Sequence, residues 1–596
     1  MCDSDSTLWW CLDDSERPIG RVRRDPQPNA TLDVVDCAGS ADIRRICELL
    51  ASVEGIWPRQ LIDTLTATEL VGWCGYDGSD QEGSTVTTQV RWLNSLAKLE
   101  EWRVVSKHRD ASAAHLHRIF NLYFEVPKAN PELLRAILDC RPVNIRCDKP
   151  PGVRFPSVAD MFACLFFFPR FCVVCQDFRH YFYQLTLPPA TRRLFSIICG
   201  GDIFSLQVWP MGFSWTPWVG QCISSLAVIR AAILAGYTVD GNAADTAPPP
   251  VLVIRNIAGT VVALGLDWYD NVILISGNAP VRDRLKAKLA IVCQELKLVV
   301  KAPGATVSVG SAEFLGIRVI RRSREGIHWA HAVDKAAQWR LIVSQPWPNA
   351  RDIAEVIGTL TWHWQLSGTP LSTIFDVIEV SRNLSRKMAK ASRRAWDRPH
   401  DLEPQTLLTL RQKLSVIAAE DAEFIRLEPV ERDDLDSQIF AASDAMNYVA
   451  AGVLLSENGP ATVTFEHRFA EDDVNEHINV KETWAAIFTV EEILCRTEQT
   501  HIVLGVDNTM AKFALSHFYF PECAELALRL LHLAEELHRR GSILTVVHVP
   551  GKLNVADEPS RGLAIDQDKA KTTLQFLHAR LGEERWRKRT VPAADP

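Results

Sequence analysis

The stretch VVCQDFRHYFYQL, Val173–Leu185, decides the fold of the first half of the chain. Its apolar residues predict a buried strand directly before Asp177, where a carboxylate emerges from a sheet. A second stretch, GLDWYDNVILIS, Gly265–Ser276, has two apolar runs around a polar tip that carries Asp270. Acidic strand ends that meet at a sheet edge can hold the two divalent metal ions of phosphoryl transfer. Either stretch alone is a weak signal, because most aspartates in turns only cap the turn.

Four more acidic residues follow the same logic in the second half of the chain. Asp444 ends an expected strand, Glu482 lies in the first turns of an amphipathic helix, Asp507 ends an apolar strand, and Asp557 follows a loop. Hydrolysis of a phosphodiester by two metal ions needs about four carboxylates on neighbouring elements, with water as the nucleophile. These residues therefore form a second candidate metal site.

Around these residues, short apolar runs separated by turns alternate with stretches of helical periodicity. The expected strands of the first half are Arg135–Asp139, Phe171–Gln176, Phe204–Val208, Val261–Leu266 and Val272–Ser276, and early helices are expected at Asp42–Ser52, Pro58–Leu70 and Val90–Val105. A helix-rich stretch runs from Asp334 to about Arg426. The second half then alternates strands at Gln438–Ser443, Ala450–Ser456, Ala461–Phe465, His501–Val506 and Ser542–His548 with helices at Val480–Arg496 and Pro521–Arg540.

The size and composition are those of a globular protein of several domains. At roughly 100–200 residues per domain, a chain of 596 residues should hold three to five units. Hydrophobic residues make up 47% and charged residues 23%. There is no uncharged apolar run of about 18 residues, and the start, MCDSDSTLWWCLDDSERP, is acidic where a signal peptide is basic. We therefore expect no membrane span and a cytoplasmic or nuclear location.

The charge and the cysteines limit the classes of function. A formal net charge of −8 weighs against a nucleic-acid enzyme, but binding needs only a local basic stripe. Ser381–Trp396 carries six basic residues and no acid, although a solvated helix face would look the same. The fifteen scattered cysteines fit reduced thiols. Cys172 and Cys175 lack a second pair at zinc-binding spacing, so we expect them to be core thiols.

The order and spacing of the motifs in the first half resemble those of reverse transcriptases, most closely those of gypsy-type, pararetroviral and DIRS-type retroelements. The resemblance covers roughly Phe124–Ile327, including the loop Trp209–Gln221 and the hairpin Glu313–Ile327. It implies that Asp177 and Asp270 hold the catalytic metals and that Phe182 rejects a ribose 2′-hydroxyl. The other nucleotide-binding residues that it implies are Lys128, Arg135, Gly212, Gln221 and Lys301, the last as a proton donor to pyrophosphate.

One position departs from the reverse transcriptase pattern. The family has an aromatic residue, any residue and then two aspartates, whereas Trp268–Asn271 reads WYDN. Asn271 can still ligate a metal ion, but it brings no charge. One charge at about 4 Å is worth on the order of 4 kcal/mol at an effective dielectric constant of 20. The chain is therefore either a weakened or adapted polymerase or an inactive one.

The second acidic set resembles the ribonuclease H of retroelements over about Ser437–Arg561. All four acids fall on the family's pattern, and the ending G-x-x-N-x-A-D-x-x-S-R, Gly551–Arg561, is its most specific piece. The resemblance implies that Asp444, Glu482, Asp507 and Asp557 are catalytic metal ligands. His548 is either the family's mobile histidine, which helps product release, or an ordinary histidine at a strand end.

These observations predict an α/β chain with a right-hand polymerase of fingers, palm and thumb, followed by a mixed-sheet ribonuclease H domain. The expected segments are an N-terminal extension of unknown role at 1–115, fingers and palm at 116–330, a helical thumb and connection at 331–430, ribonuclease H at 431–565 and a tail at 566–596. The expected cofactors are two Mg²⁺ or Mn²⁺ ions per active site.

The expected partners are an RNA template, a DNA primer, RNA–DNA hybrids and deoxynucleoside triphosphates, with retroelement or assembly proteins as further candidates. The expected activity is RNA-directed DNA synthesis with degradation of the RNA in the hybrid. Two alternatives stay open. In one, the chain is a domesticated scaffold that binds nucleic acid without polymerising. In the other, only the ribonuclease H is active.

Overall fold

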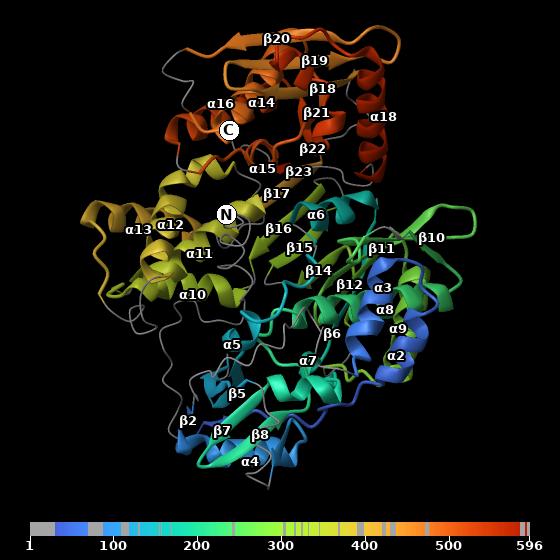
Figure 1. The fold of residues 1–596 in the computed structure, drawn as a ribbon, viewed down its shortest axis with the longest axis vertical. Helices are drawn as coiled ribbons and strands as arrows, with labels where there is room; N and C mark the ends of the chain where they lie inside the picture. Colours follow the sequence, from blue (N-terminus) through green and yellow to red (C-terminus); the bar gives the residue numbers. More distant parts are fainter. Residues whose placement is uncertain are drawn as a thin grey trace. The chain divides into compact units, whose positions relative to one another are not determined.

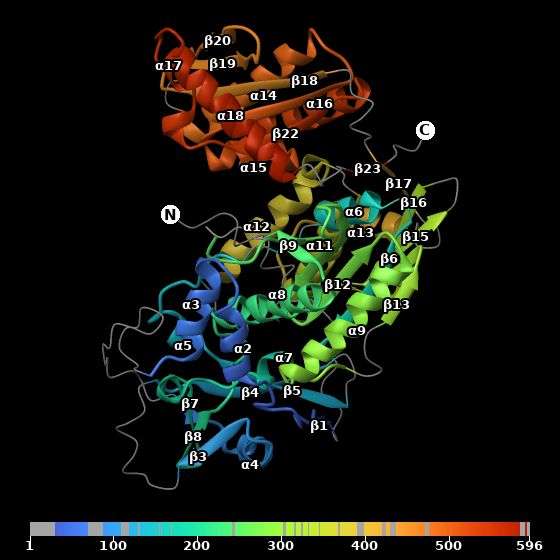
Figure 2. The same cartoon turned by 90° about the vertical axis from the view of Figure 1, so that its right-hand side faces the viewer.

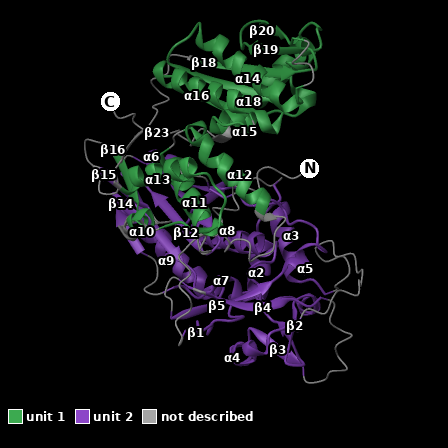
Figure 3. Cartoon of the chain, turned by 90° about the vertical axis from the view of Figure 1, so that its left-hand side faces the viewer, with its two compact units in different colours: residues 1–21, 322–596 green, residues 22–321 purple. Residues whose placement is uncertain are grey.

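The computed structural model describes residues 30–68, 87–108, 119–128, 132–301 with gaps at 154, 157, 169 and 241–244, 306–429 with gaps at 315–316, 323–325, 332, 345, 368–369, 390–398 and 420–424, and 437–592 with gaps at 471–475, 522 and 585–589. The chain divides into an N-terminal unit, Val22–Arg321, and a C-terminal unit made of Met1–Arg21 and Arg322–Pro596 (Figure 3). Several mixed sheets with helices confirm the predicted α/β class. The finer domain boundaries and the fingers, palm and thumb layout stay predictions.

A six-stranded sheet organises the N-terminal unit, with the order β13-β6-β12-β11-β10-β9 (Figure 1). Its strands are β6 Cys172–Asp177, β9 Thr238–Asp240, β10 Val251–Arg255, β11 Val261–Trp268, β12 Asn271–Ser276 and β13 Thr306–Val309. All neighbouring strands are antiparallel, so the tip of the β11–β12 hairpin lies beside the end of β6. Cys172 and Cys175 are free thiols on β6, the first buried and the second half-buried.

Two long helices accompany this sheet. α8 (Thr216–Leu234) packs against α9 (Ala279–Glu295), β9 and β11. In the described part of the chain, α8 is the one helix that is long and apolar enough to cross a membrane, but 72% of its most apolar window is buried in the protein. Its apolar composition therefore fits a core helix. Along the chain, α6 (Val158–Phe167) precedes β6 and α7 (Tyr181–Gln184) follows it.

Two smaller sheets complete the N-terminal unit. One has the order β1-β5-β4, with β1 Thr31–Leu32, β4 Leu122–Pro127 and β5 Leu133–Asp139. The other has the order β2-β7-β8-β3, with β2 Thr87–Thr88, β3 Val105–His108, β7 Ser196–Cys199 and β8 Asp202–Leu206. A hairpin of β14 (Ser311–Phe314) and β15 (Ile317–Arg322) follows the large sheet. The expected strands Arg135–Asp139 and Phe204–Val208 correspond to β5 and β8.

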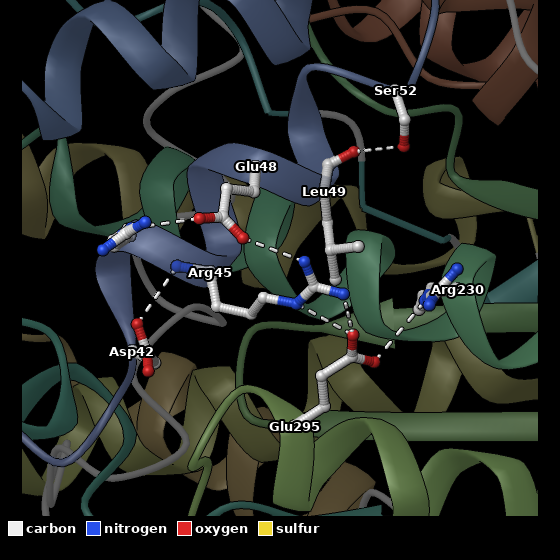
Figure 4. Close-up of polar contacts among 8 residues, drawn as sticks. Asp42, Arg45, Glu48, Leu49, Ser52, Arg230 and Glu295 are labelled. Atoms are coloured by element: carbon white, nitrogen blue, oxygen red, sulfur yellow. Dashed lines mark hydrogen bonds and ion pairs between the residues drawn. The ribbon is translucent and has the colours of Figure 1, made fainter.

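Helix α2 (Ile43–Leu50), which the sequence predicted as Asp42–Ser52, also belongs to the N-terminal unit. Ile46 and Leu50 are fully buried in the main core. On its polar side, the Nε of Arg45 donates to Glu295 Oε1 at 2.9 Å, and Arg230 of α8 lies 3.5 Å from the other oxygen of Glu295 (Figure 4). An apolar face and a carboxylate shared by two guanidinium groups thus fix α2 against α8 and α9. Two further helices are α3 (Ile56–Leu65) and α4 (Leu93–Glu101).

The C-terminal unit begins with the helix-rich stretch that the sequence predicts. Its helices are α10 Val333–Ser344, α11 Ala350–Ser367, α12 Phe375–Ala389 and α13 Pro404–Ala419. They share one apolar core, which includes Trp339 and Trp347. Strand β16 (Gly326–His331) pairs with β17 (Ile425–Pro429), and β17 pairs with β23 (Thr590–Pro592). The basic stretch Ser381–Trp396 begins on α12, and its second part, 390–396, lies outside the described residues.

A five-stranded sheet follows, with the order β20-β19-β18-β21-β22 (Figures 1 and 2). Its strands are β18 Ser437–Ala445, β19 Val449–Leu455, β20 Thr462–Arg468, β21 Thr500–Val506 and β22 Ile543–His548, with helices α14 Ile478–Leu494, α15 Thr509–His517, α16 Ala524–Arg539, α17 Asp557–Ser560 and α18 Gln567–Glu584. β18, β21 and β22 are parallel, and β18–β19–β20 is an antiparallel meander. Ala441 contacts the core of α14 and α16, whereas Phe440 and Ala442 contact the core of α18, so alternation along β18 places helices on both faces.

Two candidate sites built from carboxylates

The first candidate site lies where β6 ends beside the β11–β12 hairpin. Asn271, the first residue of β12, stands directly opposite Asp177, the last residue of β6. The backbone N–H of Phe178 donates to the carbonyl of Asp270 at 2.9 Å. Residues separated by nearly a hundred positions in sequence are therefore neighbours at this edge. The structure brings together the three residues that the sequence predicts as the polymerase centre.

The hairpin tip has an unusual backbone and a neutral side chain at its second position. Tyr269 has a φ of 50°, in the left-handed region that non-glycine residues seldom adopt. The Nδ2 of Asn271 lies 3.2 Å from Oδ1 of Asp270 and donates to it. An aspartate in place of Asn271 would set two carboxylates against one another here. The amide thus stabilises the Asp270 carboxylate by a hydrogen bond. A second carboxylate at this position would instead repel Asp270 unless a cation lay between them.

A lysine approaches the other carboxylate of this site. The Nζ of Lys301 lies 2.7 Å from Oδ2 of Asp177, and the backbone N–H of Lys301 donates to the Asp177 carbonyl at 2.9 Å. The lysine side chain is 65% exposed and the aspartate 34% exposed, so solvent screens this ion pair. Lys301 is therefore close enough to reach a ligand held at Asp177.

Polar side chains of α8 form hydrogen bonds with the β11–β12 hairpin. The Nε2 of Gln221 donates to the carbonyl of Asp267 at 2.9 Å, and its Oε1 accepts from the backbone N–H of Tyr269 at 3.0 Å. The Ser224 hydroxyl donates to the carbonyl of Tyr269, and that of Ser225 donates to Oδ2 of Asp267 at 2.8 Å. Gln221, expected to bind nucleotide, is buried, and its side chain is engaged by the hairpin backbone.

Asp267 is a buried carboxyl that the sequence did not single out. It is 2% exposed, and burial raises its pKa to about 7, although the hydrogen bond from Ser225 opposes the shift. Its other oxygen, Oδ1, has no hydrogen-bond partner in the structure. The sequence does not reveal that this carboxyl is buried, because its burial depends on how α8 packs against the hairpin.

The aromatic residue expected to discriminate the sugar lies next to the hairpin. The ring of Phe182 contacts that of Tyr269, with centroids 5.9 Å apart. Gly220 of α8 permits this position, because a Cβ at 220 would lie 2.6 Å from Cε1 of Phe182. Phe182 is partly buried against the main core. The structure thus places Phe182 beside Tyr269 of the hairpin tip, and Gly220 of α8 leaves room for its ring there.

The remaining nucleotide-binding candidates lie on the β1-β5-β4 sheet and the loop before α8. Lys128 follows β4, and its Nζ forms an ion pair with Oδ2 of Asp33 at 2.5 Å. Arg135 is half-buried on β5, opposite Val126. Gly212 has a φ of 97°, and a Cβ there would lie 3.3 Å from the carbonyl oxygen of Leu138. A glycine is therefore required where this loop passes the end of β5.

The second candidate site lies in the C-terminal unit, at the carboxyl ends of two parallel strands. Asp444 is near the end of β18, Asp507 directly follows β21, and Glu482 lies in the second turn of α14. One oxygen of each carboxylate lies within 4.8 Å of one oxygen of each of the others. Asp444 and Glu482 are buried. Oxygen ligands at this spacing suit a hard divalent cation.

The electrostatics of this cluster favour a bound cation. Burial and the charges of Asp444 and Asp507 raise the pKa of Glu482 to about 9. Burial likewise raises the pKa of Asp444 to about 7, with further contributions from Asp507 and Asp557, and it raises the pKa of Asp507. Like charges gathered in a low dielectric cannot all ionise without a counter-charge. A divalent cation would supply that charge.

The fourth acid, Asp557, is close to this cluster but is held by an arginine. It begins α17, and its Oδ1 forms an ion pair with Nη2 of Arg561 at 2.7 Å. Its charge contributes to the raised pKa values of Asp444 and Glu482. Asp557 is not among the three acids whose oxygens lie close enough to share one ion. It is therefore a candidate ligand for a second ion, in competition with Arg561.

Two polar residues of the segment Gly551–Arg561 fix the acids. The hydroxyl of Ser560 donates to Oδ2 of Asp444. Asn554 is fully buried; its Nδ2 donates to the carbonyl of Ser443 at 3.0 Å, and its side chain also hydrogen-bonds to Asp507. The sequence placed both residues in a motif without assigning them a role. Their roles depend on the folding of this loop against β18, which the spacing does not reveal.

His548 ends β22 beside the cluster. Its Nε2 lies 3.0 Å from the backbone carbonyl of Asp507. Because a carbonyl only accepts, Nε2 carries the hydrogen in this contact. The side chain therefore neighbours an expected metal ligand, and both interpretations of His548 from the sequence stay open.

Comparisons with known proteins give a fold likeness and no family. No family model matches the chain, and no curated protein matches it. Among solved structures, foamy viral protease-reverse transcriptase is similar, with 12% identity and a TM-score of 0.42 in a complex with double-stranded DNA, over 88% of this chain and 84% of that one. Another complex with double-stranded DNA has a TM-score of 0.40 and 12% identity, over 87% and 99%. A complex of the same protein with an RNA/DNA hybrid has a TM-score of 0.40 and 13% identity, over 88% of this chain and 65% of that one. Fold likeness at this level assigns no activity.

Proposed function

We propose that the chain cleaves the RNA strand of RNA–DNA hybrids at its C-terminal carboxylates and copies RNA into DNA at its N-terminal ones. The observation that carries the proposal is the cluster of Asp444, Glu482 and Asp507, whose ligand oxygens lie within 4.8 Å of one another. This arrangement concentrates negative charge at a sheet edge. Such a cluster is suited to holding the metal ions of phosphodiester hydrolysis.

In this proposal, Mg²⁺ or Mn²⁺ ions supply the activation of water and the stabilisation of the charge that develops on the phosphate. Asp444, Glu482 and Asp507 would hold one ion, and Asp557 is the candidate ligand for a second. Ser560 and Asn554 orient Asp444 and Asp507 by the hydrogen bonds described above. The fixed orientation reduces the reorganisation that substrate binding would otherwise require.

The test is cleavage of a labelled RNA strand in a hybrid by the purified full chain, with Mg²⁺ and then Mn²⁺. We expect cleavage by the parent and none by Asp507→Asn, since the amide cannot replace the charge of a metal ligand. The matched control is Asp568→Asn, which changes a highly exposed aspartate of α18. Cleavage that survives Asp507→Asn would reject this site as the nuclease.

The polymerase part of the proposal rests on Asp177 and Asp270 at the edge shared by β6 and β12. These two carboxylates would hold the metal ions, Lys301 would approach the pyrophosphate, and Phe182 would flank the sugar. The substrates would be an RNA template, a DNA primer and deoxynucleoside triphosphates. The alternative is a chain that only binds or cleaves hybrids, and the observation that favours it is the amide of Asn271 in place of a carboxylate.

Primer extension on an RNA template separates these functions. Extension by the parent that is lost in Asp177→Asn would support the polymerase. Hybrid cleavage without extension would leave a ribonuclease H alone. Hybrid binding without either activity would leave a scaffold.

A further inference from the structure

The segment Thr31–Asp42, called here the acidic strap, crosses the N-terminal unit beside the first candidate site. Its backbone N–H groups donate to carbonyls of β5, α7 and the end of α9: Thr31 to Glu132, Asp33 to Leu134, Gly39 to Tyr183, Ala41 to Gln184 and Asp42 to Leu296, at 2.8–3.0 Å. These bonds join three elements that are distant in sequence. The strap therefore has a defined course and is not a loose terminus.

The C-terminal end of the strap is firmly anchored. Asp42 caps α2 by accepting from the N–H of Arg45 at 3.1 Å and forms an ion pair with Lys297 at 2.9 Å. The following helix buries Ile46 and Leu50 and shares Glu295 with Arg230 through Arg45 (Figure 4). Because this anchor is built from both core and ion pairs, the position of the strap's carboxylates is set by the fold.

Those carboxylates meet basic groups next to Asp177. Oδ2 of Asp33 lies 2.5 Å from Nζ of Lys128 and 3.6 Å from Nε2 of His180. Oδ2 of Asp36 lies 3.1 Å from Nη1 of Arg179. Arg179 and His180 follow Asp177 by two and three residues, so the strap brings a lysine from after β4 to the end of β6. Two cations, Lys128 and Arg179, and the imidazole of His180, whose pKa is lowered by burial, thus surround two carboxylates.

The two ion pairs differ in strength. The Asp33 and Lys128 side chains are 21% and 25% exposed, whereas those of Asp36 and Arg179 are 55% and 39% exposed. Burial opposes ionisation of Asp33, but the hydrogen bond and charge of Lys128, with the charges of His180 and Arg179, hold its pKa below the usual value. Asp33 is therefore the principal counter-charge of this basic group, and the more exposed Asp36 is the weaker one.

We infer that the acidic strap is a built-in competitor for the phosphates of the incoming nucleotide, with Asp33 occupying the basic groups until a polyphosphate displaces it. The inference rests on the proposed polymerase function for its biological ligand. Its chemistry is simple exchange, since a polyanion offers Lys128 and Arg179 more negative charge than one carboxylate. The strap would keep these groups neutralised and hold back binding of weaker anions.

The test measures binding of inorganic tripolyphosphate to the full chain by titration calorimetry at low salt, without metal, primer or turnover. We expect Asp33→Asn to bind about tenfold more tightly than the parent and Asp36→Asn about twofold, because the loss of a half-buried competing charge exceeds that of an exposed one. Adding Lys128→Met to Asp33→Asn should cancel the gain. The matched control is Asp240→Asn, which removes the carboxylate of an exposed pair with Arg255 at 2.8 Å.

Unchanged or weaker binding by Asp33→Asn would overturn the inference, because it would mean that Asp33 only positions Lys128. Absence of binding by every variant would overturn it as well, and unchanged thermal melting of each variant would exclude misfolding as the cause. Failure of the polymerase proposal is recognised separately. A chain that binds tripolyphosphate more tightly after Asp33→Asn but never extends a primer retains the strap mechanism without the polymerase.

Discussion

At the scale of single residues, Asn271 shows how one atom changes the electrostatics of a site. Its Nδ2 donates to Oδ1 of Asp270, and its backbone stands opposite Asp177. Aspartate and asparagine have the same shape and both fit a strand beginning after a turn. The replacement therefore alters charge with little effect on the backbone, which makes it a clean probe of whether metal ions act here.

We predict that Asn271→Asp raises single-turnover primer extension by roughly tenfold or more, because it restores a charge beside the expected metal ions. The measurement is extension on a primed RNA template with Mg²⁺ and then Mn²⁺. Asp177→Asn serves as the inactive control. If neither the parent nor Asn271→Asp extends a primer while hybrid binding stays intact, the polymerase proposal fails.

Phe182 gives a second prediction at this scale. If the chain polymerises, Phe182→Val should admit ribonucleotides much more readily, because a smaller side chain beside Tyr269 leaves room for a 2′-hydroxyl. The measurement is the ratio of deoxyribonucleotide to ribonucleotide incorporation in parent and variant. Equal ratios would mean that Phe182 does not face the sugar. Gly220 must stay unchanged, since a Cβ there would displace the ring.

Arg561 is the corresponding probe in the second site. Because its guanidinium holds the Asp557 carboxylate at 2.7 Å, Arg561→Gln should release Asp557 for a metal ion. We predict severalfold tighter binding of the second Mn²⁺ ion in calorimetric titrations. Arg539→Gln, which removes an exposed arginine paired with Glu536 on α16, is the control. Weaker binding by Arg561→Gln would mean that the arginine orients Asp557 for the metal.

At the scale of elements, α8 and the β11–β12 hairpin act as one body. Gln221, Ser224 and Ser225 use their side chains to hold the hairpin backbone, and Ser225 also holds Asp267. A left-handed residue such as Tyr269 persists only where its surroundings fix it. The polar positions of an otherwise apolar helix therefore determine the geometry of the first site.

The buried carboxyl of Asp267 makes this contact dependent on pH. Its folded pKa, about 7, is above the ordinary value of 3.8, so the folded state binds a proton that the unfolded state has lost. The stabilisation that results is fully present below about pH 4 and is lost as the pH rises toward and through 7. The raised pKa of Asp267 corresponds to roughly 4 kcal/mol in the free energy of unfolding between acidic and alkaline pH.

We predict that Asp267→Asn, which cannot ionise, changes the melting temperature of the N-terminal unit in a pH-dependent way. The variant should be less stable than the parent or equal to it at pH 4 and should gain relative to it by pH 8. Thermal melts at a series of pH values measure this. A constant difference between the two proteins across the series would show that Asp267 stays ionised in the folded state.

Local patterns predicted the elements, and tertiary packing determined the rest. The apolar run at Phe171–Gln176 is β6, shifted by one residue, and the expected helix Val480–Arg496 is α14, Ile478–Leu494. The resemblance to ribonuclease H selected Asp444, Glu482 and Asp507 from the sequence, and the structure gathers them at one edge because β18 and β21 are parallel. The sequence could not predict the contact of Lys128 with Asp33, because a two-residue strand such as β1 has no periodicity to read.

At the scale of the whole molecule, the two candidate sites belong to different compact units. Asp177 and Asp270 lie in Val22–Arg321, and Asp444, Glu482 and Asp507 lie in the unit that contains Arg322–Pro596. Each site has its own sheet and its own set of carboxylates. Loss of charge in one therefore leaves the carboxylates of the other in place.

We predict that the two chemistries separate by mutation. Asp177→Asn should leave the rate of hybrid cleavage within about twofold of the parent, and Asp507→Asn should do the same for primer extension, because substitutions in sites that share no residues behave additively. Parallel assays of both activities on both variants test this. Loss of both activities from either single substitution would show that the units depend on one another for catalysis.

The shared carboxylate of Glu295 also bears on biosynthesis. Its partner Arg45 precedes it by 250 residues, so a growing chain releases α2 from the ribosome long before the helix that receives it exists. During that interval α3, the next helix in the chain, is present, but the partners of α2 in α8 and α9 are not. The final placement of α2 therefore waits for α9, and pairing across such a separation slows folding. Chaperones that bind short apolar helices would meet this chain at α2.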